Sequence, residues 1–139
     1  MNIIRILILE DDLETLSILL DRLHKLEEKL TVEKEPTSIA VTVLSEYTQV
    51  EEYINKAKNI TFDSILLDRD CKAGGSFHVL DINKYGIDKI IGISSTPPYN
   101  EQLKQRGVRN IVQKDYANLP RFADKVISVI EEVLVVNKS

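Results

Sequence analysis

The sequence lacks several features that would point to particular classes of protein. Its single cysteine, Cys71, excludes an internal disulfide and suits a reducing compartment. It has no block of basic residues and its net charge is -4, so we do not expect nucleic-acid binding. The apolar run from Ile3 to Leu9 is too short to span a membrane, and no cleavage site follows it. We therefore expect no membrane association and a cytoplasmic location.

The remaining composition is typical of one globular domain. The chain has 139 residues, of which 43% are hydrophobic and 29% are charged, and it contains no repeat, low-complexity tract or linker. A single domain over residues 1–139 fits this length. Short apolar segments predict strands at 3–9, 39–47, 63–68, 88–93 and 108–112, and helical periodicity predicts helices at 13–30, 50–57, 76–85, 96–106 and after 118.

This alternation of strand and helix predicts an α/β fold. Five strand–helix units favour a five-stranded parallel sheet with helices on both faces and right-handed crossovers. In such a sheet the carboxyl ends of all strands lie at one edge, where ligands bind. The residues that reach this edge are Glu10 and Asp11 after the first strand, Asp68 and Asp70 after the third, Ser94 after the fourth and Lys114 after the fifth.

These side chains together favour phosphoryl chemistry. Each has an ordinary alternative, since aspartate and serine also cap helices and form turns, and a lone lysine is usually solvated. As a set, the acids can hold Mg²⁺ through oxygen, and Asp68 can act as the nucleophile for a phosphoryl group. The Ser94 hydroxyl and the Lys114 ammonium would neutralise charge on the phosphoryl oxygens. His78 has no nucleophile beside it and is interpreted as a helix or surface residue.

Over nearly its whole length the sequence resembles the response-regulator receiver domains of two-component signalling. The acidic pair of that family resembles Glu10-Asp11 in Ile-Leu-Ile-Leu-Glu-Asp-Asp, and the phospho-accepting aspartate matches Asp68 in Ile-Leu-Leu-Asp. The switch hydroxyl matches Ser94 in Gly-Ile-Ser-Ser, and the family's lysine matches Lys114. The resemblance implies a flavodoxin-like (βα)5 fold with strand order 2-1-3-4-5.

The resemblance also implies a metal and partners. Asp11 and Asp68 would bind Mg²⁺ directly, Glu10 through water, and Asp70 through its backbone carbonyl. A histidine kinase or histidine phosphotransfer protein would donate the phosphoryl group. The chain would be a stand-alone receiver that contacts an unknown downstream protein, as a monomer or homodimer, and would perform no catalysis beyond its own phosphorylation and dephosphorylation. The signalling face would include Tyr99, Gln102, Arg106, Ile111, Gln113 and Tyr116.

Four positions depart from the family pattern. Cys71-Lys72 replaces the usual Met-Pro, and Ile111 replaces the usual aromatic switch residue. Asp115 replaces the proline that follows the lysine. Because a cis bond before a non-proline residue costs about 3 kcal/mol, we expect the Lys114–Asp115 bond to be trans.

Two other functions are considered. A receiver-like interaction module that is no longer phosphorylated would explain the changed loop residues. A haloacid-dehalogenase-like phosphatase would use Asp68-Arg69-Asp70 as its Asp-x-Asp motif. The order of the motifs argues against the phosphatase, because its Asp-x-Asp lies near the N-terminus and here the acidic cluster at Glu10 comes first.

Overall fold

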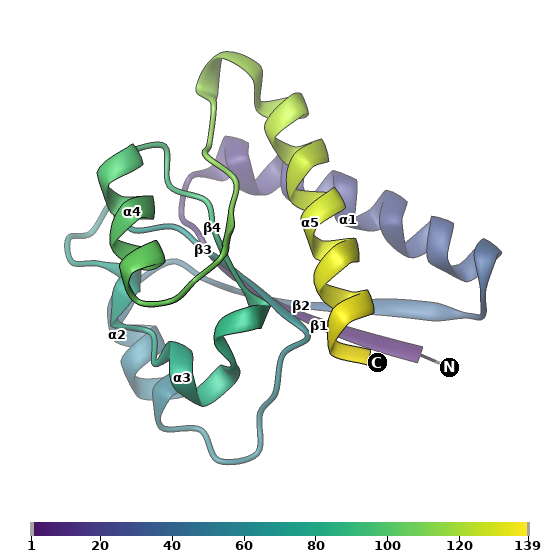
Figure 1. The fold of residues 1–139 in the computed structure, drawn as a ribbon, viewed down its shortest axis with the longest axis horizontal. Helices are drawn as coiled ribbons and strands as arrows, with labels where there is room; N and C mark the ends of the chain where they lie inside the picture. The colour runs from purple at the N-terminus through teal and green to yellow at the C-terminus, as the bar shows by residue number, and fades with distance from the viewer. Residues whose placement is uncertain (1, 139) are drawn as a thin grey trace.

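The computed structural model describes residues 2–138, so Met1 and Ser139, the two ends of the expected domain, lie outside the described residues. Five parallel strands form one sheet in the order β2-β1-β3-β4-β5, which confirms the predicted flavodoxin-like α/β fold (Figure 1). The strands are β1 (Asn2–Leu9), β2 (Thr37–Leu44), β3 (Ser64–Leu67), β4 (Ile90–Gly92) and β5 (Asn110–Ile111).

Helices cover both faces of the sheet. They are α1 (Leu13–Glu33), α2 (Tyr47–Gln49) with a π-helical continuation (Val50–Asn55), α3 (Ile82–Tyr85), α4 (Pro97–Gln105) and α5 (Leu119–Lys138). Single 3-10 turns occupy Phe77–Val79, Ile87–Lys89 and Tyr116–Asn118. No helix within residues 2–138 is both long and apolar enough to cross a membrane.

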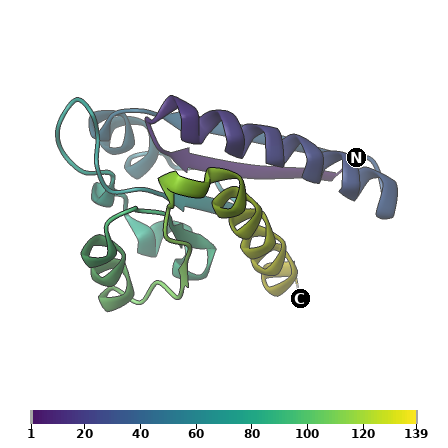
Figure 2. The ribbon, with the colours of Figure 1, turned by 90° about the horizontal axis from the view of Figure 1, so that it is seen from above.

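The sheet separates two hydrophobic cores. Ile4, Ile6 and Ile8 of β1 pack toward α1 and α5, whereas Leu7 and Leu9 pack toward α2, α3 and α4. Burial of both faces explains why β1 is a nearly continuous apolar run. Only the second half of β1 pairs with β3, so its first half extends beside α1 and β2 beyond the shorter strands (Figure 2).

The second predicted helix differs from the expected one. Val50 and Ile54 lie on the buried face of this helix, predicted over 50–57, but the Tyr53 side chain is 65% exposed and the helix ends at Asn55. The wider π-helical turn accounts for the difference, because it keeps residues four apart on the inner face and turns the residue at spacing three toward solvent.

The third predicted helix, over residues 76–85, is interrupted. Its first part is the single 3-10 turn, and the chain then becomes extended at Leu80, whose side chain is 1% exposed. Asp81 starts α3 by accepting a hydrogen bond from the Lys84 N–H at 3.2 Å. Gly86 ends α3 with φ 102°, as the sequence predicted for a glycine at this stop.

Candidate functional site

The carboxyl ends of four strands meet around Lys114. This residue is 3% exposed, and its ammonium contacts Oε1 of Glu10 and lies 3.4 Å from Oδ2 of Asp68. Its backbone N–H donates to the Ser94 carbonyl at 3.2 Å. The structure therefore brings together Glu10, Asp68, Ser94 and Lys114, which lie far apart in the sequence.

Glu10 is fully buried at the end of β1 and has two different contacts. Its Oε2 accepts hydrogen bonds from the N–H groups of Asp11 and Asp12 at 3.0 and 3.1 Å, which shapes the turn into α1. Its Oε1 faces Lys114. Asp12 caps α1 by accepting a hydrogen bond from the Thr15 N–H at 3.0 Å, so the third acid of this cluster has a structural role.

The buried charges at this site are not balanced. Burial, and then the charge of Asp68, raise the pKa of Glu10 to about 7 against the opposing effect of Lys114. Burial also raises the pKa of Asp68, again against the effect of Lys114. Burial acts to lower the pKa of Lys114, but the two carboxylates hold it above its ordinary value. One ammonium therefore serves two carboxylates, which leaves the site short of positive charge.

Asp11 and Asp70 lie differently from the other acids. The Asp11 carboxylate accepts a hydrogen bond from the backbone N–H of Lys72, which ties the loop after β3 to the start of α1. The Asp70 side chain is 61% exposed and pairs with Arg69 at 2.7 Å. Within residues 2–138, no three acidic, histidine or cysteine side chains lie close enough together to hold a metal ion.

The donor chemistry of the site nevertheless suits Mg²⁺. The available donors are carboxylate oxygens, which this hard cation prefers. Burial is the main cause of the raised pKa values of Glu10 and Asp68, and repulsion by the charge of Asp68 adds to the rise at Glu10. A cation beside them would relieve this repulsion, although the Asp11 carboxylate would have to leave Lys72 to join them.

Ser94 is held in place by a residue that sequence reasoning missed. The Asn100 amide oxygen accepts a hydrogen bond from the Ser94 N–H at 3.2 Å, and its NH₂ donates to the Ser94 carbonyl at 2.9 Å. Asn100 is 3% exposed on the inner side of α4. The only signal in the sequence is its spacing of three from the buried Leu103, which places both on one helix face. The Ser94 hydroxyl itself accepts from the Thr96 N–H at 3.1 Å.

The loop after β3 packs tightly beside the site. Gly75 has φ +84°, and a side chain there would overlap the Tyr47 ring, so this position requires glycine. Gly74 has φ +95° but open space around it. Cys71 is 7% exposed, and burial raises the pKa of its thiol to about 11, so at neutral pH the side chain stays protonated and the reactive thiolate is not formed.

An aromatic ring lies near Lys114, but not from the usual position. Ile111 packs closely against Gly92. A Cβ atom added to Gly92 would lie only 2.7 Å from Cδ1 of Ile111. The Tyr116 ring centre is instead 5.4 Å from the Lys114 ammonium, and the Tyr116 side chain is 57% exposed. The Lys114–Asp115 bond is trans, as expected, because residues 2–138 contain no cis peptide bond.

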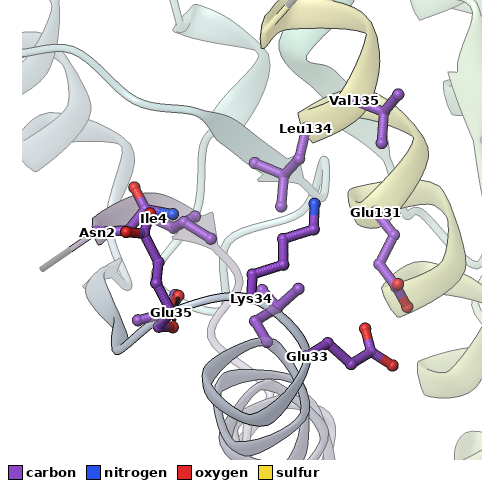
Figure 3. A pocket seen from close by; sticks show the side chains of 10 residues that line it. Asn2, Ile4, Glu33, Lys34, Glu35, Glu131, Leu134 and Val135 are labelled. Carbon is purple, nitrogen blue, oxygen red and sulfur yellow. Dashed lines mark hydrogen bonds between the residues drawn. The ribbon is translucent and has the colours of Figure 1, made fainter.

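A cavity of about 370 Å³ lies at the other end of the sheet (Figure 3). Its walls come from the start of β1 and from the last turns of α1 and α5, and its lining includes Ile4, Lys34, Glu131 and Leu134. Because Asp68 follows the carboxyl end of β3, this cavity is not part of the candidate site.

Comparisons with known proteins show a likeness of fold to solved structures. No protein-family model and no curated protein matches the sequence. A solved structure, that of the bacteriophytochrome response regulator AtBRR, has a TM-score of 0.53 and 19% sequence identity, and the match covers 93% of this chain and 95% of that chain. The chain has the receiver fold. At this level of identity the likeness concerns the fold, and the chemistry must be argued from the site.

Proposed function

We propose that the chain is a receiver domain that accepts a phosphoryl group on Asp68. The observation that carries this proposal is the buried contact of Lys114 with both Glu10 and Asp68, at the strand ends of a receiver fold. A histidine kinase or histidine phosphotransfer protein would be the donor. The signal would pass to a downstream protein by direct contact, with no catalysis beyond the domain's own phosphorylation and dephosphorylation.

The transfer uses Asp68 as the nucleophile. An Asp68 carboxylate oxygen forms a bond to phosphorus while the bond from phosphorus to the donor's imidazole nitrogen breaks. Lys114 already lies 3.4 Å from Oδ2 of Asp68, so its ammonium neutralises charge on the phosphoryl oxygens without a long movement. The Ser94 hydroxyl leaves the Thr96 N–H to donate to a phosphoryl oxygen.

Mg²⁺ fits this reaction as a cofactor. When bound, it supplies positive charge that offsets the carboxylates and the incoming phosphoryl group. Asp11 and Asp68 would hold it directly, Glu10 through water, and Asp70 through its backbone carbonyl. The exposed carboxylate of Asp70 is not needed for this role, because it points to Arg69.

Intact-mass measurement after incubation with acetyl phosphate and Mg²⁺ tests the proposal. The wild-type protein should gain the mass of a single phosphoryl group, and Asp68→Asn should gain none. Asp70→Asn is the matched control, since it changes an exposed carboxylate two residues away and keeps the backbone carbonyl. An unchanged wild-type mass, or a gain that persists in Asp68→Asn, would refute phosphorylation at Asp68.

One observation favours a second candidate, a receiver-like module that is not phosphorylated. Glu10 and Asp68 already share Lys114, and the Asp11 carboxylate is engaged by Lys72. A module of this kind would show no mass gain and no Mg²⁺ binding in calorimetry. Rapid turnover of small phosphate esters would indicate a haloacid-dehalogenase-like phosphatase instead.

A further inference from the structure

In the described part of the chain, strand β2 forms an open edge of the sheet and pairs with β1 alone. All eight of its residues pair with β1 in continuous register from Thr37 to Leu44. Along a strand, successive residues direct their N–H and C=O groups to opposite sides. The Pro36 carbonyl accepts from the Asn2 N–H at 3.0 Å, so the even-numbered residues face β1 and the odd-numbered residues face outward.

Side chains of this chain cover both ends of the open edge. The Thr31 hydroxyl bonds to the outward N–H and C=O of Thr37, each at 3.1 Å. The Glu27 carboxylate accepts from the Ile39 N–H at 2.6 Å. Beyond the other end, the Gln49 side chain accepts from the Ser45 N–H at 3.1 Å. The ends of this edge are therefore closed to another strand.

The middle of the edge is open. Within residues 2–138, the outward N–H and C=O groups of Val41 and Val43 have no hydrogen-bond partner. The usual protections of an edge strand are also absent, since Thr37–Leu44 contains no charged residue and no proline, and its register with β1 shows no bulge. Beside this segment, the Val43 and Leu20 side chains are 38% and 41% exposed.

We propose that β2 pairs antiparallel with β2 of a second copy of this chain, about a two-fold axis through Thr42. In this register Val41 of each copy lies opposite Val43 of the other, and the two residues exchange both of their N–H···O hydrogen bonds. The pairing uses the outward groups of Val41 and Val43 and ends before Ile39 and Ser45, which would face each other in this register and whose N–H groups are held by Glu27 and Gln49. The result is one continuous ten-stranded sheet, with the two five-stranded sheets joined at β2.

A second copy is the occupant that this edge fits best. The open segment is symmetric about Thr42, so it is complementary to itself, as a two-fold interface requires. Because β2 itself carries no charge, the segments that pair around Thr42 bring no charged side chains of this strand together, although each copy has a net charge of -4. The other open edge, β5, and the candidate site around Lys114 remain accessible, since β2 and β5 lie at opposite edges. The inference is independent of the proposed phosphorylation.

Disulfide trapping tests the register. In the proposed pair, the two Thr42 residues are direct non-hydrogen-bonded neighbours with Cα atoms about 4.5 Å apart. Thr42→Cys should therefore give a disulfide-linked dimer under mild oxidation. Ala40→Cys is the control, because two Ala40 residues would be about 13 Å apart, beyond the roughly 7 Å that a disulfide spans. The native Cys71 is buried and should not interfere.

Sedimentation velocity over a range of concentrations tests the association itself. The wild-type protein should dimerise, and Thr42→Lys should weaken the dimer by at least about tenfold, equivalent to about 1.4 kcal/mol, because two ammonium groups would face each other at the axis. Thr61→Lys, at an exposed position in the loop before β3, should leave it unchanged.

Three outcomes would overturn the inference. They are a wild-type protein that stays monomeric at its highest soluble concentration, equal disulfide yields from Thr42→Cys and Ala40→Cys, and equal weakening by both lysine variants. If the wild-type protein stays monomeric, the strand that could pair with the β2 edge would have to come from a different protein. The trapping experiment does not depend on the folding of the lysine variants.

Discussion

His78 provides a pH-dependent prediction that can be isolated by mutation. Its side chain is half-buried after β3, and its Nε2 is buried with no hydrogen-bond partner within residues 2–138. Burial, and then the positive charges of Arg106 and Arg69, lower the pKa of His78 to about 4 from the usual 6.5. The folded protein therefore holds this imidazole neutral. His78 lies in the 3-10 helical turn Phe77–Val79, which agrees with the prediction of a helix or surface residue, but it is half-buried rather than fully exposed.

The sign of the effect follows from the lowered pKa. Between pH 6.5 and pH 4 the unfolded chain binds a proton at His78 and the folded chain does not, so the free energy of unfolding falls as the pH falls. The shift from 6.5 to about 4 corresponds to at most about 3 kcal/mol. Since solvent reaches part of the ring, we expect about half of this, roughly 1.5 kcal/mol.

Urea denaturation of wild type and His78→Phe at pH 7 and pH 4.5 measures this effect. Phenylalanine does not titrate, so the variant should lose less free energy of unfolding than the wild type on acidification, by about 1.5 kcal/mol. The chain has two histidines, and His24 is the matched control because its side chain is 66% exposed and pairs with Glu28. If wild type and His78→Phe lose equal stability, the proposed burial of a neutral imidazole is wrong.

Two further variants examine the candidate site. Lys114→Met should lower the free energy of unfolding by about 3 kcal/mol at pH 8, because Glu10 and Asp68 would remain buried without a counter-charge. The loss should be smaller at pH 5, because Glu10, with a pKa of about 7, is protonated there and needs no counter-charge. An equal loss at both pH values would contradict this reasoning. Asn100→Leu should lower the free energy of unfolding, measured by urea denaturation, by about 2 kcal/mol, because the backbone groups of Ser94 lose their hydrogen-bond partners. It should also slow phosphorylation by acetyl phosphate. Wild-type values for both measurements would exclude this role of Asn100.

The main strands and the meeting of their ends could be predicted from the sequence for a simple reason. A strand that is buried on both faces must be apolar throughout, and Ile6 to Leu9 and Ile65 to Leu67 have this character. Alternation with helices then makes the strands parallel, so their carboxyl ends share one edge. The closeness of Glu10, Asp68 and Lys114 follows from topology alone.

Contacts between a side chain and a distant backbone could not be predicted in the same way. Asn100 has the appearance of a solvated helix residue, and its role depends on how the loop after β4 approaches α4. The burial of His78 depends on the end of the helical turn at Leu80. There Arg106 donates hydrogen bonds to the carbonyls of His78 and Leu80. Such contacts are set by the paths of loops, for which the sequence offers no periodic pattern.

The charges around Lys114 indicate how phosphorylation would reach the surface. A phosphoryl group on Asp68 would add negative charge to a site in which one ammonium already serves two carboxylates. Lys114 would then be drawn away from Glu10 toward the phosphoryl oxygens. Its backbone N–H is bonded to the Ser94 carbonyl, and that same carbonyl accepts from Asn100 of α4. A shift of Lys114 therefore acts on a hydrogen-bonded chain that ends in α4, so the position of this helix should depend on the charge of Asp68 even though Ile111 replaces an aromatic residue.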